Sequence, residues 1–510
     1  MHSHLTRDPR STALAVIAIG LLVRFVLAGT VGLGVDESYV IAVSRQLSLS
    51  YFDHPPLHLW LVGLAARLTQ SEAAVVLRLP FVLCFAGTTW MLFLLTARLF
   101  DECAGAFAVV LINVSAVFSL STGGWVLPDG PLMFFMVAAA LVISRILFAG
   151  EASLPGGATL QWMLAGLLTG LATLSKYHGV FVLFGATLFL LSSARHRRWL
   201  ATPGPYLGAL VTAVCVLPVL LWNREHAWAS FVFQGARATG TGGVHPVALL
   251  SNIAGQMAWV LPWIFVPLAA ALWRAARTGP RDSARWFLLC LAIGPIAAFT
   301  LIALRGDIGL PHWQAPGWLF VFPALGAAAA ERMERDDRTT RRWLRWSVGG
   351  YIGLIAVLAS QANRGWMVRV APSAFAKGDP TTDLLDWREV RPALEANGWL
   401  PAGGFVAAPS WIQAGKAAVG VGPDWPVLCL CADPHHFRYM QDDRRWLGHD
   451  AVLLVKHKER DDVLAKFSPY FTSVTLAGQV PLHRHGVPAM TVDVYKASGF
   501  RQLYPTDQSR

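Results

Sequence analysis

Apolar stretches of similar length recur along the first 360 residues, separated by short polar breaks. A helix that crosses a bilayer needs about 20 predominantly apolar residues, and these stretches approach that length. We expect roughly 11 crossings, at residues 13–31, 75–97, 104–121, 131–149, 162–175, 178–193, 204–221, 256–273, 286–304, 313–330 and 346–360. The pattern therefore predicts a polytopic α-helical membrane protein.

The first polar break has a helical pattern of its own. Two apolar stripes at helical spacing are formed by Tyr39, Val43 and Leu47, and by Leu57, Trp60, Leu61, Leu64 and Leu68. Amphipathic helices of this kind lie in the plane of the membrane interface. We predict that the first loop, at about residues 36–70, forms an interfacial helical layer.

The pattern changes after Gln361, where apolar runs shorten to strand length and Asp, Pro and Gly become frequent. The runs predict strands at 405–408, 427–431, 451–455 and 491–495, and helices at 387–397 and 461–467. Such a mixture is typical of a small α/β domain. We therefore predict a transmembrane domain over residues 1–361 and a soluble α/β domain over residues 362–510.

Composition and charge support this division. A chain that is 55% hydrophobic and only 14% charged is too apolar for a soluble protein of 510 residues. The net charge of +11 would suit a nucleic-acid partner, but the basic residues concentrate in three breaks, at 195–198, 274–285 and 332–345. The positive-inside rule assigns these clusters to the cytoplasm, so they are topology signals.

The same rule predicts the orientation of the chain. Alternation from a cytoplasmic N-terminus places the loops with Asp36, Asp129, Lys176 and His312 on the opposite side of the membrane. The C-terminal domain lies on that side as well. We expect a multi-pass membrane protein whose soluble domain lies outside the cytoplasm.

Carboxylates gather in three of these outer loops: Asp36 beside Glu37, Asp53 beside His54, and Asp129. Each Asp precedes a helical pattern or a proline, so a helix N-cap is one interpretation of each. The convergence of three acids on one side of the membrane favours a substrate site.

A lysine and a histidine are further candidates. Lys176 lies between two apolar stretches, next to Tyr177, and a cation at that depth is costly unless it is paired. It either reaches to the interface or marks a binding site, where the phosphate of a lipid would be its partner. His312 lies among tryptophans of an interfacial belt, and it orients a substrate, binds a metal or is structural.

Several of these motifs carry a resemblance to a known family. They are Asp36-Glu37-Ser38-Tyr39, Tyr51-Phe52-Asp53-His54-Pro55-Pro56-Leu57, Arg78-Leu79-Pro80, Pro128-Asp129-Gly130-Pro131-Leu132, Ser175-Lys176-Tyr177, Trp222-Asn223 and His312-Trp313. In order and spacing, residues 11–330 resemble the bacterial family 39 glycosyltransferases of the GT-C superfamily, which includes protein O-mannosyltransferases and the aminoarabinose transferase of lipid A. A weaker match, Asp379-Pro380-Thr381 with Asp386-Trp387, resembles the juncture before that family's outer domain.

The resemblance implies an activity and roles for these residues. Members transfer a sugar from a polyprenyl phosphate to an acceptor on the outer face, usually with inversion. Carried onto this chain, the general base is Asp36, Glu37 assists it or supports the loop, Asp129 is a second acid and Lys176 lies near the lipid phosphate. Further substrate-binding candidates are Asp53, His54, Tyr177 and His312.

The implied acceptor is lipid A, core oligosaccharide, another glycolipid or a protein, and the partners are the lipid-linked donor, this acceptor and membrane lipids. A divalent cation is left open, because Asp36, Asp129 and His54 hold one only if they approach one another. A transporter or flippase of lipid-linked sugars is the alternative function. Transporters place polar groups at the bilayer midplane, whereas these acids lie at helix ends, which favours the enzyme. A non-catalytic binding module on a membrane scaffold is a third interpretation.

Overall fold

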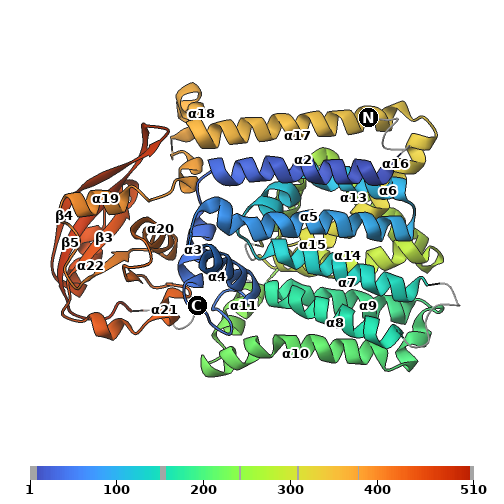
Figure 1. Cartoon of the computed structure of the whole chain (residues 1–510), viewed down its shortest axis with the longest axis horizontal. Coiled ribbons are helices and arrows are strands. Elements are labelled where there is room, and N and C mark those ends of the chain that lie inside the picture. The colour runs from blue at the N-terminus through green and yellow to red at the C-terminus, as the bar shows by residue number, and fades with distance from the viewer. Residues whose placement is uncertain (1–7, 150–156, 240–242, 307–308, 377, 506–510) are drawn as a thin grey trace. The chain divides into compact units, whose positions relative to one another are not determined.

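The computed structural model describes residues 8–149, 157–239, 243–306, 309–376 and 378–505 (Figure 1). These residues form two compact units. The helical unit contains residues up to Val26, Leu49–His58 and Leu79–Leu354. The mixed unit contains Leu27–Ser48, Leu59–Arg78 and the chain from Ile355 onward.

Within the described ranges, seven helices are long and apolar enough to cross a membrane. They are α2 (Pro9–Thr30), α5 (Ala74–Leu99), α7 (Asp129–Leu147), α8 (Ala158–Ser175), α10 (Gly204–Glu225), α14 (Ser283–Leu304) and α17 (Arg338–Arg364). An eighth span results if α12 (Pro246–Val260) and α13 (Pro262–Thr278) count as one. The polytopic helical fold class is confirmed, whereas the expected count of 11 is not.

The remaining expected crossings correspond to short or broken helices. They are α6 (Glu102–Asn113) with a π-helix at Val117–Thr122, α9 (Phe181–Ser192) after a 3₁₀ turn, and α15 (Ala315–Leu319) with α16 (Phe322–Glu334). The break between α12 and α13 lies at Leu261, which has φ +82° and precedes Pro262, and the two helices meet at 111°. Because proline has no amide hydrogen and restricts the residue before it, the helix ends there.

Small residues allow the long helices to approach closely. Gly166 of α8 and Gly208 of α10 lie so near each other that a methyl group on Gly166 would overlap the Gly208 backbone. Contacts between glycine backbones bring two membrane helices closer together and so increase the van der Waals packing between them. The buried core of the unit continues through α6, α7, α9, α14 and α16.

The mixed unit contains a five-stranded sheet in the order β2-β1-β3-β5-β4. Its strands are β1 (Phe405–Ala408), β2 (Val427–Cys429), β3 (Ala451–Lys456), β4 (Phe471–Arg484) and β5 (Val487–Phe500). The first three pair in parallel, and β5 runs antiparallel to both β3 and β4. The pattern predicted four of these strands and missed β4, whose burial alternates irregularly around a bulge.

Helices cover both faces of the sheet. On one face, α19 (Val390–Ala396) and α20 (Trp411–Val421) pack against side chains such as Val406 and Val452. On the other, α22 (Val463–Phe467) packs against their sequence neighbours, such as Phe405 and Leu453. The two sets alternate because successive strand residues point to opposite faces. The other α-helices among the described residues are α3 (Val35–Ser44), α4 (Leu57–Thr69), α11 (Ala229–Thr239), α18 (Trp366–Val370) and α21 (Phe437–Met440).

Candidate active site

The two acids of the first loop have different surroundings. Helix α3 begins after Gly34, whose backbone amide donates to the Glu37 carboxylate at 2.7 Å. Glu37 is buried, whereas Asp36 is exposed in the first turn. A carboxylate in the first turn of a helix is stabilised by the helix dipole. The cap of α3 is therefore made by Gly34 and Glu37, and the Asp36 carboxylate remains exposed on the surface.

Arg78 holds Glu37 in place. Its Nε and Nη2 atoms lie 2.7 and 2.5 Å from the two carboxylate oxygens of Glu37. Its remaining donors reach the carbonyls of Ala28, Val31 and Gly32, so the guanidinium closes the end of α2 and the start of the loop. A buried pair is tolerated where geometry and further hydrogen bonds are good. Of the two roles left open for Glu37, this geometry favours support of the loop.

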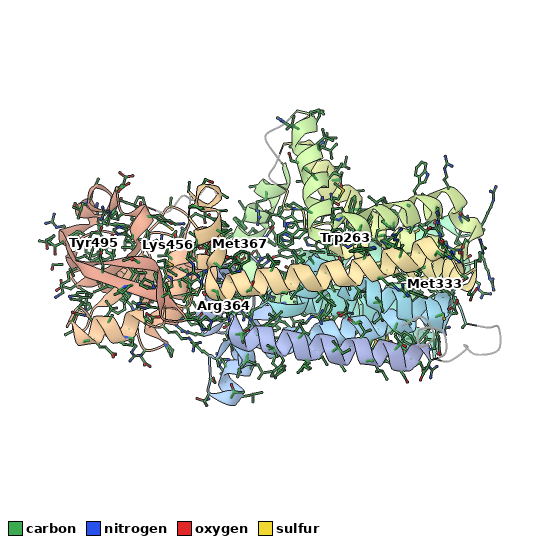
Figure 2. The ribbon with its side chains drawn as sticks, turned by 90° about the horizontal axis from the view of Figure 1, so that it is seen from above. Trp263, Met333, Arg364, Met367, Lys456 and Tyr495 are labelled. Atoms are coloured by element: carbon green, nitrogen blue, oxygen red, sulfur yellow. The ribbon has the colours of Figure 1, made fainter. Side chains whose placement is uncertain are left out.

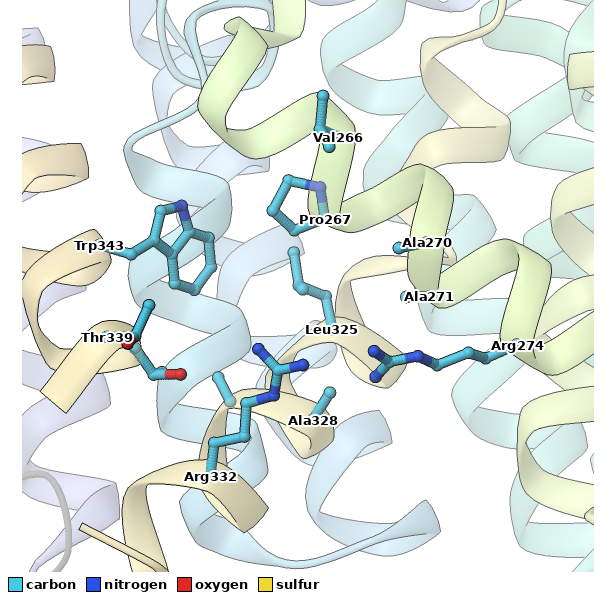
Figure 3. A pocket seen from close by; sticks show the side chains of 12 residues that line it. Val266, Pro267, Ala270, Ala271, Arg274, Leu325, Ala328, Arg332, Thr339 and Trp343 are labelled. Atoms are coloured by element: carbon cyan, nitrogen blue, oxygen red, sulfur yellow. The ribbon is translucent and has the colours of Figure 1, made fainter. Parts of the chain in front are cut away.

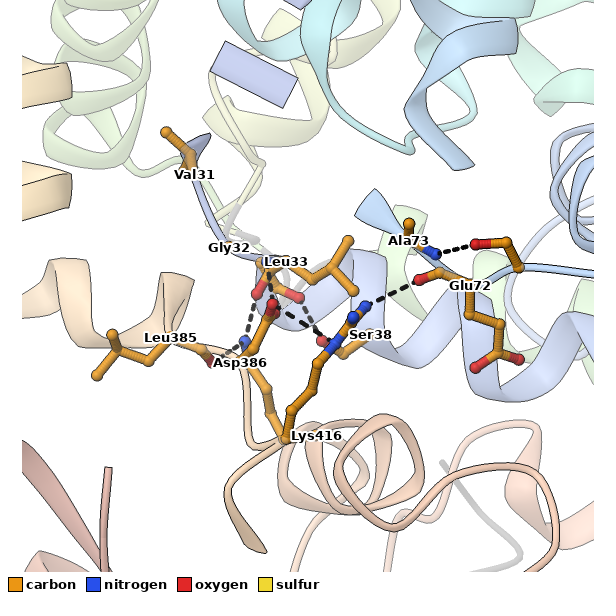
Figure 4. Close-up of polar contacts among 12 residues, drawn as sticks. Val31, Gly32, Leu33, Ser38, Glu72, Ala73, Leu385, Asp386 and Lys416 are labelled. Atoms are coloured by element: carbon orange, nitrogen blue, oxygen red, sulfur yellow. Dashed lines mark hydrogen bonds and ion pairs between the residues drawn. The ribbon is translucent and has the colours of Figure 1, made fainter. Parts of the chain in front are cut away.

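The C-terminal part of the chain also anchors this loop (Figure 4). The Asp386 carboxylate accepts from the amide of Leu33 at 2.9 Å, and Lys416 of α20 donates to the carbonyls of Leu33 and Leu385. Burial lowers the pKa of Lys416 to about 8, so it remains mainly charged at neutral pH. The loop that bears Asp36 is thus bound to the C-terminal part of the mixed unit.

Helix α20 lies directly on α3. A methyl group at Gly415 would stand 2.8 Å from the backbone nitrogen of Tyr39, which only glycine avoids. The Tyr39 hydroxyl accepts from the amide of His436 at 3.0 Å, and its ring packs edge-on against Trp411. The first loop and the C-terminal domain therefore share one core, a relation that linear sequence does not show.

The helical unit contains a second buried pair. Lys176 Nζ lies 3.0 Å from each carboxylate oxygen of Asp129, and both residues are less than 7% exposed. Asp129 starts α7 without making a cap hydrogen bond. The cap interpretation of Asp129 and the interfacial interpretation of Lys176 are therefore wrong. So is the expectation that Lys176 lacks a partner in the protein, because Asp129 supplies one.

Helix α11 shapes the loop that contains Asp53 and His54. Ser230 donates to the carbonyl of Tyr51 at 2.9 Å, and Gln234 donates to the carbonyl of Asp53 at 2.6 Å. Ser230 in turn is held by the fully buried Asn223, whose side chain accepts from its amide at 3.1 Å. The Trp222-Asn223 motif therefore acts on the 51–54 loop through α11.

Two histidines lie in the field of the buried pair. Burial lowers the pKa of His54 to about 4, the Asp53 charge opposes this shift, and the Lys176 charge reinforces it. Burial and then Lys176 lower the pKa of His312 to about 4 as well. Both rings are therefore neutral at pH 7, and each can offer one donor and one acceptor nitrogen.

Sequence analysis missed several polar groups of this cluster. Arg237 of α11 lies 5.0 Å above the Trp313 ring and acts on both His54 and His312. His58 is fully buried and 5.5 Å from His54, ring to ring, and His178 stacks on Phe299 at 4.4 Å. Both nitrogens of His58 and Nε2 of His178 are buried without a hydrogen bond to the described residues. The signal that could have identified the two histidines is their position in or beside an apolar stretch.

The predicted site residues are thus divided between the units. Asp53, His54, Asp129, Lys176 and His312 belong to the helical unit and influence one another electrostatically. Tyr177 follows Lys176 and packs against Phe231, at 5.7 Å between ring centres. Asp36 and Glu37 belong to the mixed unit.

Metal binding was left open by the sequence. Over the ranges that the structure describes, no three His, Cys, Asp or Glu residues are grouped so that they could hold a metal ion. The polar groups of the helical unit are instead the Lys176–Asp129 ion pair and the neutral imidazoles of His54 and His312. Such a set can bind a phosphate and hydroxyl groups through hydrogen bonds.

Part of this cluster, namely Asp53, His54, Asp129 and Lys176, lies within a family match. Residues 53–222 match the model of dolichyl-phosphate-mannose-protein mannosyltransferases. The lipid A galacturonosyltransferase RgtD of Rhizobium johnstonii is 28% identical over 277 residues, which cover 53% of this chain and 55% of that protein. An undecaprenyl phosphate-alpha-4-amino-4-deoxy-L-arabinose arabinosyl transferase of Erwinia tasmaniensis is 24% identical over 51% of this chain and 47% of its own length. The chain spans about half the length of the curated relatives it matches.

Solved structures show the same fold over nearly the whole chain. ArnT from Cupriavidus metallidurans in the apo state has a TM-score of 0.66 at 14% identity, and the match covers 94% of this chain and 97% of ArnT. The structure of that protein bound to undecaprenyl phosphate has a TM-score of 0.64 with the same coverage. The resemblance predicted from the sequence is confirmed: the chain is similar to these sugar transferases, and it has the fold of ArnT.

Proposed function

We propose that the protein is a glycosyltransferase that moves a hexosyl or pentosyl unit from a polyprenyl phosphate to a cell-envelope acceptor, with inversion at the anomeric carbon. The buried Lys176–Asp129 pair carries this proposal, because it lies within the segment that matches the mannosyltransferase family. Both curated relatives are named as sugar transferases, one for lipid A and one with an undecaprenyl phosphate donor. Lipid A is therefore the first acceptor to test, ahead of core oligosaccharide, other glycolipids and protein.

The donor side of the reaction is assigned to the helical unit. The bond between the anomeric carbon and a phosphate oxygen breaks, and its electron pair stays on the phosphate. Lys176, together with Arg237, stabilises that charge, which a low-dielectric surrounding makes more effective. The neutral rings of His54 and His312, with Asp53 and Tyr177, are assigned to sugar and phosphate oxygens.

The acceptor side is assigned to Asp36. Its exposed carboxylate takes the proton of the acceptor hydroxyl or amine while that atom forms the new bond to the anomeric carbon. General base catalysis of this type contributes about 10²- to 10⁴-fold. Glu37 is assigned a positioning role, because both of its oxygens are engaged by Arg78 and the amide of Gly34.

The proposal also includes the orientation of the chain in the membrane. The protein is a multi-pass membrane protein of the GT-C type. We place it in the bacterial inner membrane with its N-terminus in the cytoplasm, and with the acids and the soluble α/β domain in the periplasm. The arginine-rich breaks and the positive-inside rule support this orientation. The flippase alternative gains no support, because the curated relatives are transferases.

Mass spectrometry of envelope lipids and glycans tests the proposal. Cells that lack the protein should lose one sugar substituent, and the wild-type chain should restore it. The Asp36→Asn variant should accumulate in the membrane without restoring it, whereas Asp461→Asn, which removes an exposed acid of the same unit, should behave as wild type. Full restoration by Asp36→Asn would show that Asp36 is not the base, and an unchanged lipid profile in the deletion strain would refute the transferase.

A further inference from the structure

A groove in the helical unit is lined by none of the residues assigned to transfer. It has a volume of about 320 Å³ and is formed by α13, α16 and α17. Its walls are apolar and include Pro267, Leu325 and Trp343 (Figure 3). Pockets of this size hold small ligands or part of a larger one.

Two arginines stand at one end of this groove. Figure 3 shows the guanidinium groups of Arg274, from α13, and Arg332, from α16, turned toward the same space. Neither guanidinium group makes a hydrogen bond or a salt bridge to another side chain within the described ranges, although the charge of Arg332 acts on Asp337. Arg285 in the same region pairs with Asp282 and with Glu331.

Asp337 interacts electrostatically with Arg332, and its carboxylate is also engaged in hydrogen bonds. Asp337 accepts from the amide of Thr339 at 3.0 Å and from the hydroxyl of Thr340 at 2.7 Å, which caps α17. Both arginines are exposed, and two guanidinium groups that face the same space form a site of positive potential, of which the single charge of Asp337 offsets only a part. The end of the groove is therefore complementary to a negatively charged group.

The flank of the groove is apolar and exposed. Val266 is 60% exposed, and the neighbouring Trp273 and Trp346 are 60% and 72% exposed. Trp263 of α13 lies against α17 near Gly350 (Figure 2). The Trp343 indole donates to the Trp263 carbonyl at 2.7 Å. Exposed apolar surface on a helix of a multi-pass protein faces lipid chains. The groove thus combines a lipid-facing wall with a cationic end.

We propose that this groove binds an anionic glycerophospholipid, with an acyl chain against Leu325 and Trp343 and the phosphate between Arg274 and Arg332. Basic pockets between membrane helices bind the headgroups of such lipids. Both arginines belong to the breaks whose charge assigns them to the cytoplasmic side, so the lipid would come from the leaflet opposite the transfer site. The site concerns a structural lipid and does not depend on the transfer chemistry.

Native mass spectrometry of the delipidated full-length protein tests this proposal. Phosphatidylglycerol should be retained at one molecule per chain, and phosphatidylcholine should be retained about tenfold less. Arg274→Gln with Arg332→Gln should weaken phosphatidylglycerol binding about 10- to 30-fold, since each cation contributes about 1 kcal/mol. Arg342→Gln with Arg345→Gln removes the same charge outside the groove and should change binding less than about twofold.

Two further variants separate charge from shape. Ala328→Phe should block the groove and lose the lipid while both arginines remain. Arg274→Lys with Arg332→Lys should retain it, which provides a test if the Gln variant fails to fold. Equal retention by the Gln variant, loss in the folded Lys variant, or equal binding of phosphatidylcholine would overturn the proposal. Displacement of the lipid by millimolar inorganic phosphate would assign the site to a soluble anion instead.

Discussion

Two of the buried ion pairs of this protein, Arg78–Glu37 and Lys176–Asp129, have opposite characters. The Arg78 guanidinium donates to both oxygens of Glu37 and to three backbone carbonyls, so its donors are occupied. Lys176 donates to Asp129 alone among the described residues, and it lies beside histidines with unsatisfied ring nitrogens. A fully satisfied pair stabilises structure, whereas a pair that leaves donors and acceptors nearby can take part in binding. The comparison separates the support of the first loop from the proposed donor site.

Removal of Arg78 should have the largest effect. Arg78→Met leaves Glu37 buried without its cation, which should destabilise the fold by about 3–5 kcal/mol. Thermal denaturation in detergent measures this loss. Arg78→Met combined with Glu37→Met should recover most of the stability, because no uncompensated charge remains. Failure of the double variant to recover would mean that the carbonyl contacts of Arg78 dominate.

Removal of Lys176 should separate stability from activity. Lys176→Met should reduce transfer by about 10²- to 10³-fold through the loss of phosphate stabilisation, and it should also reduce stability. Combining it with Asp129→Leu should restore stability but not transfer. A double variant that regains activity would contradict the role of Lys176 in catalysis.

Acidification should act on the helical unit through His54 and His312. Their folded-state pKa values of about 4 lie below the ordinary value of 6.5, so the unfolded chain binds more protons between these limits. The stability they contribute is present above pH 6.5 and is lost as pH falls toward 4, by roughly 1 kcal/mol per pH unit for each ring. The melting temperature between pH 7.5 and 4.5 measures this loss. His54→Asn with His312→Asn should flatten the profile, and an unchanged slope would assign the effect to other groups.

The smallest effect is expected where α20 meets α3. Gly415→Ala places a methyl group 2.8 Å from the backbone nitrogen of Tyr39 and should cost about 1–3 kcal/mol. Gly349→Ala is the matched control, since a methyl group there meets no other atom within 4 Å. Equal melting temperatures for both variants would mean that α20 can shift without loss.

Local pattern accounts for the parts of the fold that depend on near neighbours. The strands at 405–408 and 451–455 were predicted because their apolar runs are short, and the structure places them in β1 and β3. The crossing count was not confirmed, because hydropathy does not report a helix break such as the one before Pro262. Strand β4 was missed because its exposed and buried residues do not alternate regularly.

The sequence by itself determined the membrane-spanning class, the change of character after Gln361 and the residue types of the candidate site, because composition and periodicity are local properties of the chain. Only the tertiary structure decided the partners. It joined Glu37 to Arg78, Asp129 to Lys176 and α3 to α20, across separations of 41, 47 and several hundred residues. The physical reason is that a buried charge must find a partner in space, and sequence distance does not limit which residue supplies it.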